Sequence, residues 1–122
     1  MPLPAPETPL FDPIAIDRLR KVAGDQGATF IAEMARLFLE ETTRVLTELQ
    51  AGSEREDWKA VSRFAHSVKS SAATLGLMRL SAACKALEAD TRNATSSSET
   101  AGHVAAVMDE FKQATPTLQR LF

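Results

Sequence analysis

Apolar side chains recur every three to four residues along most of this chain, and no stretch alternates apolar and polar residues with a period of two. The first spacing gathers apolar side chains on one face of an α-helix, whereas a half-buried strand requires the second. No internal repeat is present. The pattern therefore predicts an all-α protein.

Interruptions of this period divide the chain into one short and four longer helices. The short helix is expected at residues 13–23, with Asp12 as its N-cap and Pro13 at its first position. The longer helices are expected at residues 28–51, 55–75, 77–92 and 102–114. Four such helices with short connections predict an antiparallel four-helix bundle, and the short helix should lie across one end of it.

Local signals also predict where the longer helices start and stop. Ser53 or Glu54 should lie near the start of the helix at 55–75, and Gly76 should end it. Pro116 should break or kink the last helix, with Thr115 capping a further turn.

The first 12 residues differ in composition from the rest of the chain. Prolines at positions 2, 4, 6 and 9 favour a stiff, extended segment that cannot form a helix. We therefore expect a linker at residues 1–12 and a single domain at 13–122, as in a domain taken from the end of a longer protein.

Charge and composition exclude several classes of function. The net charge is only −2 and no basic stripe is present, which argues against binding to nucleic acid. No apolar run has the length of a membrane span, and the N-terminus lacks the features of a signal peptide. A single cysteine cannot form an internal disulfide, which fits a reducing compartment. We therefore expect a cytoplasmic domain without direct membrane contact.

One histidine lies away from the apolar face of its helix. At about 100° per residue, His66 projects roughly 150° from the centre of the apolar stripe of the helix at 55–75. The stripe consists of Trp58, Val61, Phe64, Ala65, Val68, Ala72 and Leu75. His66 should therefore be exposed.

The surroundings of His66 are small or basic. Lys69 is on the adjacent row of the same helix, and no carboxylate lies within one turn of the imidazole on that helix. We expect a partner to approach over four residues of this face: Ser62, Arg63, Ser70 and Ala73. Small side chains allow close approach of a second surface, and an imidazole beside a lysine suits a group that accepts an anion.

Other candidate residues receive structural interpretations. Cys84 falls in the apolar stripe of the helix at 77–92 and should be buried and unreactive. His103 follows a polar loop and should be solvated. Leu39 and one of Phe30 or Leu37 should lie partly outside the core, either under the short first helix or as a docking patch beside His66.

The stretch around His66 resembles the histidine-containing phosphotransfer (HPt) family. The resemblance rests on an exposed His, Lys at the third position after it, small residues next, and a Gly closing the helix, here His66-Ser67-Val68-Lys69-Ser70-Ser71 with Leu75-Gly76. The following sequence "LMRLSAACKALEADTR" is similar to the next helix of the family. Ser70 departs from the Gly that many members carry, which adds a hydroxyl close to the phosphate.

The resemblance implies a phosphorelay function. His66 would accept a phosphoryl group from the Asp of a receiver domain and pass it to another receiver, and Lys69 would offset charge on the phosphoryl oxygens. Receivers of response regulators or of a hybrid sensor kinase would be the partners, and they would supply Mg²⁺, because this chain has no acidic cluster beside His66. The domain would be a monomer with no cofactor of its own. Without a Gly-rich nucleotide loop it should not phosphorylate itself from ATP.

Three alternatives remain open at this point. The first is a non-catalytic helical module for protein interaction or dimerisation. The second is a metal-assisted or general-base enzyme, which would require more ligands around His66 than Ser, Ala and Lys. The third is a phosphotransfer domain that also binds another protein through the same face.

Overall fold

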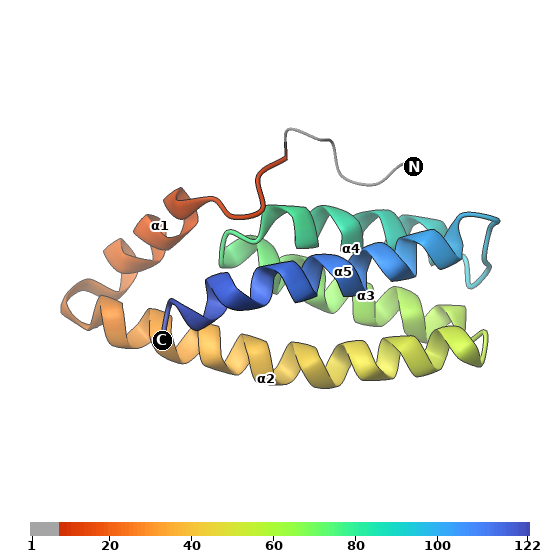
Figure 1. Cartoon of the computed structure of the whole chain (residues 1–122), viewed down its shortest axis with the longest axis horizontal. Helices are drawn as coiled ribbons and strands as arrows, with labels where there is room; N and C mark the ends of the chain where they lie inside the picture. Colours follow the sequence, from red (N-terminus) through yellow and green to blue (C-terminus); the bar gives the residue numbers. More distant parts are fainter. Residues whose placement is uncertain (1–7) are drawn as a thin grey trace.

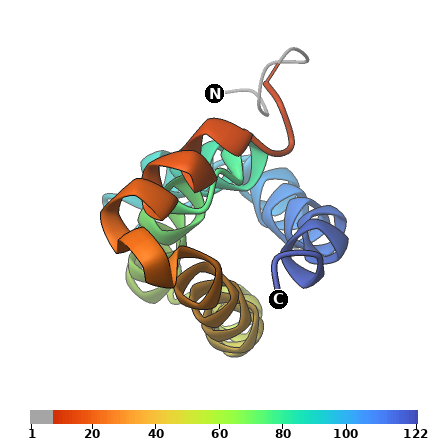
Figure 2. The same cartoon turned by 90° about the vertical axis from the view of Figure 1, so that its left-hand side faces the viewer.

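The computed structural model describes residues 8–122, which form five α-helices and no strand. Helix α1 (Pro13–Ala23) leads through a 3₁₀ turn (Gly24–Gln26) into α2 (Gly27–Glu54). Helices α3 (Trp58–Thr74), α4 (Met78–Thr91) and α5 (Thr100–Gln119) follow. Helices α2 to α5 run antiparallel to their chain neighbours, and α1 lies across one end of this bundle (Figures 1 and 2). The predicted four-helix bundle with an additional short N-terminal helix is confirmed.

The segment before α1 packs against the bundle where the structure describes it. Leu10 and Phe11 are half-buried and contact the core. Asp12 caps α1, since its Oδ1 atom accepts a hydrogen bond of 3.0 Å from the backbone nitrogen of Ile14, and Pro13 occupies the first turn. The predicted start of this helix is therefore confirmed. Prolines 2, 4 and 6 of the predicted linker lie outside the described residues.

Each helix of the bundle contributes one apolar stripe to a shared core. On α3 the predicted stripe is confirmed, since Val61, Ala65, Val68, Ala72 and Leu75 are buried and Trp58 and Phe64 are half-buried. Helix α4 contributes the buried residues Leu80, Ala83, Cys84 and Leu87. The small residues of α4 let it lie close to α3, which matters for the site described below.

The junction between α2 and α3 differs from the prediction. Helix α3 begins at Trp58, and its N-cap is Asp57, whose side chain accepts a hydrogen bond of 3.2 Å from the backbone nitrogen of Ala60. The predicted start near Ser53 or Glu54 is wrong, because α2 continues through Gly52 to Glu54. Gly52 is buried against α3, and a Cβ atom there would lie 3.4 Å from Val61 Cγ2. Gly52 thus serves helix packing rather than helix termination.

Pro116 does not end the last helix as predicted. Helix α5 runs from Thr100 through Pro116 to Gln119. The hydroxyl of Thr115 donates a hydrogen bond of 2.9 Å to the carbonyl of Phe111, so Thr115 is an interior helix residue and not a cap. Leu118, beyond the proline, is fully buried. Its burial holds the final turn in place, because core packing outweighs the one backbone hydrogen bond that a proline removes.

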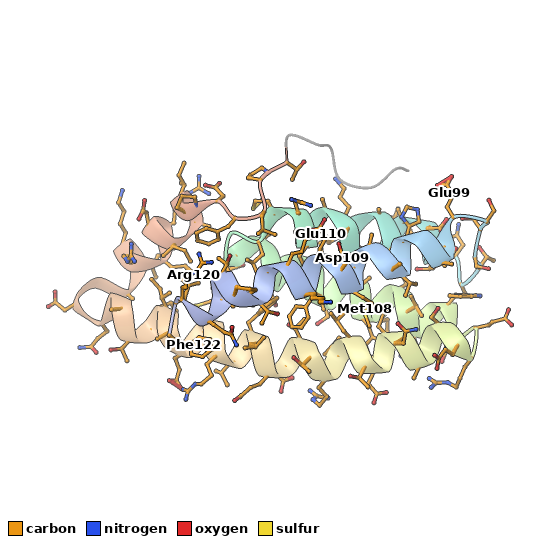
Figure 3. All side chains as sticks on the ribbon, in the orientation of Figure 1. Glu99, Met108, Asp109, Glu110, Arg120 and Phe122 are labelled. Carbon is orange, nitrogen blue, oxygen red and sulfur yellow. The ribbon has the colours of Figure 1, made fainter. Side chains whose placement is uncertain are left out.

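An ion pair joins α4 to α5 beside the core. Arg79 Nη2 on α4 lies 3.1 Å from Glu110 Oε2 on α5, and the Glu110 side chain is only 10% exposed. Figure 3 shows Glu110 on the side of α5 that faces α4. The pair holds α4 and α5 in a fixed position relative to each other. Neither of its two residues is close to His66 in the sequence.

Among residues 8–122, no helix combines the length and apolar character needed to cross a membrane.

Candidate functional site

His66 lies on the outer face of α3. Its side chain is 62% exposed, whereas its neighbour Ala65 is completely buried. The helix therefore presents the imidazole to solvent in the middle of its length, as the helical wheel predicts.

A single carboxylate contacts both His66 and Lys69. Glu88 on α4 places Oε2 2.7 Å from His66 Nδ1 and Oε1 2.6 Å from Lys69 Nζ. The Glu88 side chain is 14% exposed and that of Lys69 28% exposed. Glu88 was not predicted to lie here, since the sequence shows only that no carboxylate lies within one turn of His66 on its own helix.

Glu88 is ionised at neutral pH. Partial burial alone would raise the pKa of its carboxyl group, but hydrogen bonds from Lys69 and His66, together with their charges, outweigh burial and lower the pKa below its ordinary value. An ionised carboxylate only accepts hydrogen bonds, so the proton in the contact with His66 belongs to Nδ1. The neutral ring then carries its free lone pair on Nε2.

The α4 sequence explains the position of Glu88. Glu88 directly follows Leu87 and lies four residues after Cys84, so it occupies the edge of the buried stripe. The hydroxyl of Ser81 donates a hydrogen bond of 3.0 Å to the carbonyl of Lys69, which ties α4 to α3. The sequence does contain a sign of this contact. Glu88 is a carboxylate at the edge of the apolar stripe through which α4 packs on α3.

Cys84 does not belong to the reactive part of this site. It is fully buried, as predicted. Burial, with a smaller contribution from the negative charge of Glu88, raises the pKa of its thiol to about 12, and nearby Lys69 lowers it only in part. A thiol in this state is not a nucleophile near neutral pH.

The four predicted docking residues flank His66 on α3. Arg63 and Ser70 are exposed, and Ser62 and Ala73 are half-buried. Ala73 is therefore less accessible than the wheel predicted. The hydroxyl of Thr74 donates to the carbonyl of Ser70 over 3.0 Å, so this backbone oxygen already has a partner.

A groove of about 460 Å³ lies between α2 and α3 and reaches the residue next to His66. Its apolar lining includes Met34, Leu37, Phe38, Val45, Val68 and Leu75, and its polar lining includes Glu41, Ser67 and Ser71. Leu37 is 52% exposed and Phe30 39% exposed, while Leu39 is half-buried. Both Phe30 and Leu37 thus lie partly outside the core, where only one of them was expected to.

His103 is buried, and the prediction that it is solvated was wrong. Its side chain is 4% exposed, with Nε2 3.7 Å from Oε1 of Glu99. Asp90 explains the burial, because it accepts hydrogen bonds from the hydroxyls of Ser97 and Thr100 and folds the polar loop back onto α4. These bonds lower the pKa of the Asp90 carboxyl although partial burial opposes them. The histidine therefore follows an ordered turn and lies inside the protein.

The geometry at His66 suits transfer of an anionic group to an exposed imidazole. Among residues 8–122, no group of three or more His, Cys, Asp or Glu side chains is arranged to hold a metal ion. The site instead combines one exposed imidazole, one ammonium group and one carboxylate that contacts both.

Comparisons with known proteins agree with this geometry. Residues 33–114 match the family model described as "Hpt domain", and this range contains His66, Lys69 and Glu88. The fold is similar to the crystal structure of histidine-containing phosphotransfer protein B (HptB) from Pseudomonas aeruginosa PAO1, with a TM-score of 0.79, 21% identity and coverage of 92% of this chain and 93% of that chain. No curated protein sequence matches the chain significantly. The chain therefore belongs to the Hpt domain family, the histidine phosphotransfer domains of phosphorelays.

Proposed function

We propose that His66 is the phosphoacceptor of this domain and that Nε2 is the atom that carries the phosphoryl group. The contact between His66 Nδ1 and the Glu88 carboxylate carries this proposal, because it leaves the lone pair on Nε2 while the ring stays 62% exposed. His103 is 4% exposed and offers no comparable access.

The reaction is a phosphoryl exchange with a receiver domain. The Nε2 lone pair attacks the phosphorus of a phospho-Asp, the N–P bond forms, the O–P bond breaks, and its electron pair returns to the receiver carboxylate. The same steps in reverse pass the phosphoryl group to the Asp of another receiver. Exposure of His66 on a convex helix allows either receiver to reach it.

Lys69 stabilises the charge of the transferred group. Its ammonium group has three donors, and Glu88 Oε1 uses one of them at 2.6 Å. The side chain remains 28% exposed, so a phosphoryl oxygen can accept a second donor. Lys69 can therefore contact Glu88 and the phosphoryl group together.

The receiver approaches over the outer face of α3. Ser62, Arg63, Ser70 and Ala73 flank His66 there, and the groove between α2 and α3 continues this surface. The receiver provides the phosphorylated Asp and its own Mg²⁺. The domain needs no cofactor and no ATP-dependent kinase activity of its own.

The cellular setting follows from these partners. We expect a monomeric domain in the cytoplasm, where it meets receivers of response regulators or of a hybrid sensor kinase. It would act either as a free protein or as the C-terminal domain of a membrane-bound hybrid sensor kinase.

Transfer from phosphorylated receivers tests the proposal. Incubation with a panel of ³²P-labelled receiver domains should give label on this protein that is acid-labile and base-stable, as expected for phosphohistidine. His66→Gln should remove the label, and His103→Gln should retain it. Label that persists in His66→Gln would refute the assignment. A correctly folded wild-type protein that receives no label from any receiver would favour a non-catalytic interaction module.

A further inference from the structure

We infer that Arg63 binds the phosphoryl group on His66 Nε2 from the side opposite Lys69, and that this contact protects the phosphohistidine from hydrolysis between transfers. The inference rests on the proposed role of His66 as phosphoacceptor. It gives Arg63 a contact with the phosphoryl group itself, in addition to its place on the surface that a receiver covers.

The two basic residues one turn from His66 lie on opposite sides of it. At about 100° per residue, Lys69 projects roughly 60° to one side of His66 and Arg63 roughly 60° to the other. Lys69 is on the α4 side, because its Nζ lies 2.6 Å from Oε1 of Glu88. Arg63 is on the side of Ser67, which lines the groove between α2 and α3. Since α3 lies between α2 and α4 (Figure 2), the two cations flank the imidazole.

Burial divides this face of α3 in the same way. The residues on the α4 side are half-buried: Ser62, Lys69 and Ala73. The residues on the groove side are exposed: Arg63, Ser67 and Ser70. The groove side therefore has the room that a phosphoryl group needs, and Arg63 is the basic residue of α3 on that side within one turn of His66.

The orientation of the imidazole directs a phosphoryl group toward Arg63. The contact between His66 Nδ1 and Glu88 turns the Nδ1 edge of the ring toward α4. In an imidazole ring the outward directions at Nδ1 and Nε2 are nearly opposite, so the Nε2 lone pair points into solvent and away from α4. Side chains three residues apart on a helix have Cβ atoms only about 5–6 Å apart, a distance that an arginine side chain can span.

The guanidinium group of Arg63 is available for this contact. Arg63 forms no ion pair within residues 8–122, whereas Glu41, the carboxylate that lines the groove, is paired with Arg44 on its own helix. A guanidinium group presents its N–H donors in a planar fork that matches two phosphoryl oxygens at once. Arg63 can therefore bind the phosphoryl group without giving up another partner.

This contact should slow hydrolysis of the phosphohistidine. In hydrolysis, water attacks the phosphorus, the N–P bond breaks with its electron pair returning to Nε2, and inorganic phosphate leaves with the oxygen and protons of the water. The transition state is loose, and the phosphoryl group in it resembles metaphosphate, which carries one negative charge fewer than the dianionic group. A guanidinium group on the phosphoryl oxygens therefore stabilises the phosphorylated protein more than the transition state.

The lifetime of the phosphoprotein in the absence of any receiver separates this role from docking. Phosphoramidate can load wild type, Arg63→Gln, Arg63→Lys and the matched control Lys59→Gln, with the P–N bond of the donor breaking and ammonia leaving. Lys59 is an exposed basic residue of α3, two turns before His66. After removal of the donor, ³¹P NMR follows the phosphohistidine of each protein near neutral pH, and thermal unfolding confirms that each variant is folded.

We expect Arg63→Gln to shorten the lifetime of the phosphohistidine by about threefold to tenfold, and Lys59→Gln to match wild type. Arg63→Lys keeps the charge but loses the fork, so its lifetime should lie between those of wild type and Arg63→Gln. Equal lifetimes of wild type and Arg63→Gln would overturn the inference. Equal shortening in Arg63→Gln and Lys59→Gln would also overturn it, because net charge alone would then account for the effect. Failure of wild-type His66 to take up phosphate would instead refute the proposed function.

Discussion

The backbone nitrogen of Asp12 donates a hydrogen bond of 2.8 Å to the carbonyl oxygen of Gly76, which joins the start of α1 to the turn between α3 and α4. The close approach is possible because Gly76 has no side chain. Its φ of +80° lies in the left-handed region, and a Cβ atom would lie 2.4 Å from the carbonyl oxygen of Asp12. Gly76 therefore both ends α3 and admits the segment that leads into α1.

We predict that Gly76→Ala destabilises the protein. The left-handed conformation costs a non-glycine residue about 1–2 kcal/mol, and the contact with Asp12 adds to this cost. The free energy of unfolding, measured by urea denaturation, should fall by at least about 2 kcal/mol. Gly102→Ala is the matched control, since nothing lies within 4 Å of a Cβ atom there and alanine favours helix. Equal stability of Gly76→Ala and wild type would contradict this account.

The helices and the N-cap of α1 were predictable because their signals are local. Asp12 and Pro13 lie side by side, and the α3 stripe depends only on a period of 3.6 residues. Pro116 shows the limit of such rules, because tertiary burial of Leu118 carries the helix past it.

The site was predictable only in part, for a related reason. His66 and Lys69 lie on one helix and were identified from their spacing, whereas Glu88 is 22 residues from His66 in the sequence. Their contact depends on the lateral packing of α4 on α3. The burial of His103 likewise depends on hydrogen bonds that Asp90 makes to a loop, which residue type and helix period do not encode.

Lys69→Ala should slow phosphoryl transfer in a protein that still folds, although loss of the ion pair with Glu88 should lower its melting temperature. Loss of one electrostatic contact to the phosphoryl oxygens should cost about 1–3 kcal/mol in the transition state, or roughly a 10–100-fold decrease in rate. Rapid-quench transfer assays with a phosphorylated receiver measure this rate. Lys59→Ala, an exposed α3 lysine remote from the Glu88 contact, should transfer normally. An unchanged rate in Lys69→Ala would remove this residue from the site.

The Glu88 contact should stabilise the protein above the acid range. Because the pKa of Glu88 is lower in the folded state than its ordinary value of 4.5, the contribution is fully present above that value and disappears as the pH falls through the folded-state pKa. Wild type should therefore melt at a higher temperature than Glu88→Gln near neutral pH, and the gap should close in acid. A gap that does not change with pH would show that the contribution is not electrostatic.

The two histidines should differ in chemical reactivity. His66 is 62% exposed and His103 only 4% exposed, so diethyl pyrocarbonate should modify His66 rapidly in the folded protein and reach His103 only in denaturant. Peptide mapping by mass spectrometry distinguishes the two sites. Rapid modification of His103 under native conditions would show that the turn held by Asp90 opens readily.

Ala73→Arg tests the direction from which a receiver approaches. Ala73 lies two turns beyond His66, is half-buried, and accepts a hydrogen bond of 3.0 Å from the backbone nitrogen of Gly76. The substitution leaves this backbone bond intact, and the long arginine side chain can extend into solvent, so the melting temperature should change little. The added side chain should nevertheless occupy space that the receiver must enter.

Transfer from a phosphorylated receiver to Ala73→Arg should therefore fall strongly, while phosphorylation by phosphoramidate should stay near the wild-type rate. Ala101→Arg, on the exposed side of α5, is the matched control and should behave like wild type in both assays. If receiver transfer to Ala73→Arg is unchanged, the partner does not cross this part of α3. If the variant unfolds, the half-buried methyl group of Ala73 contributes to the core and does not belong to the docking surface.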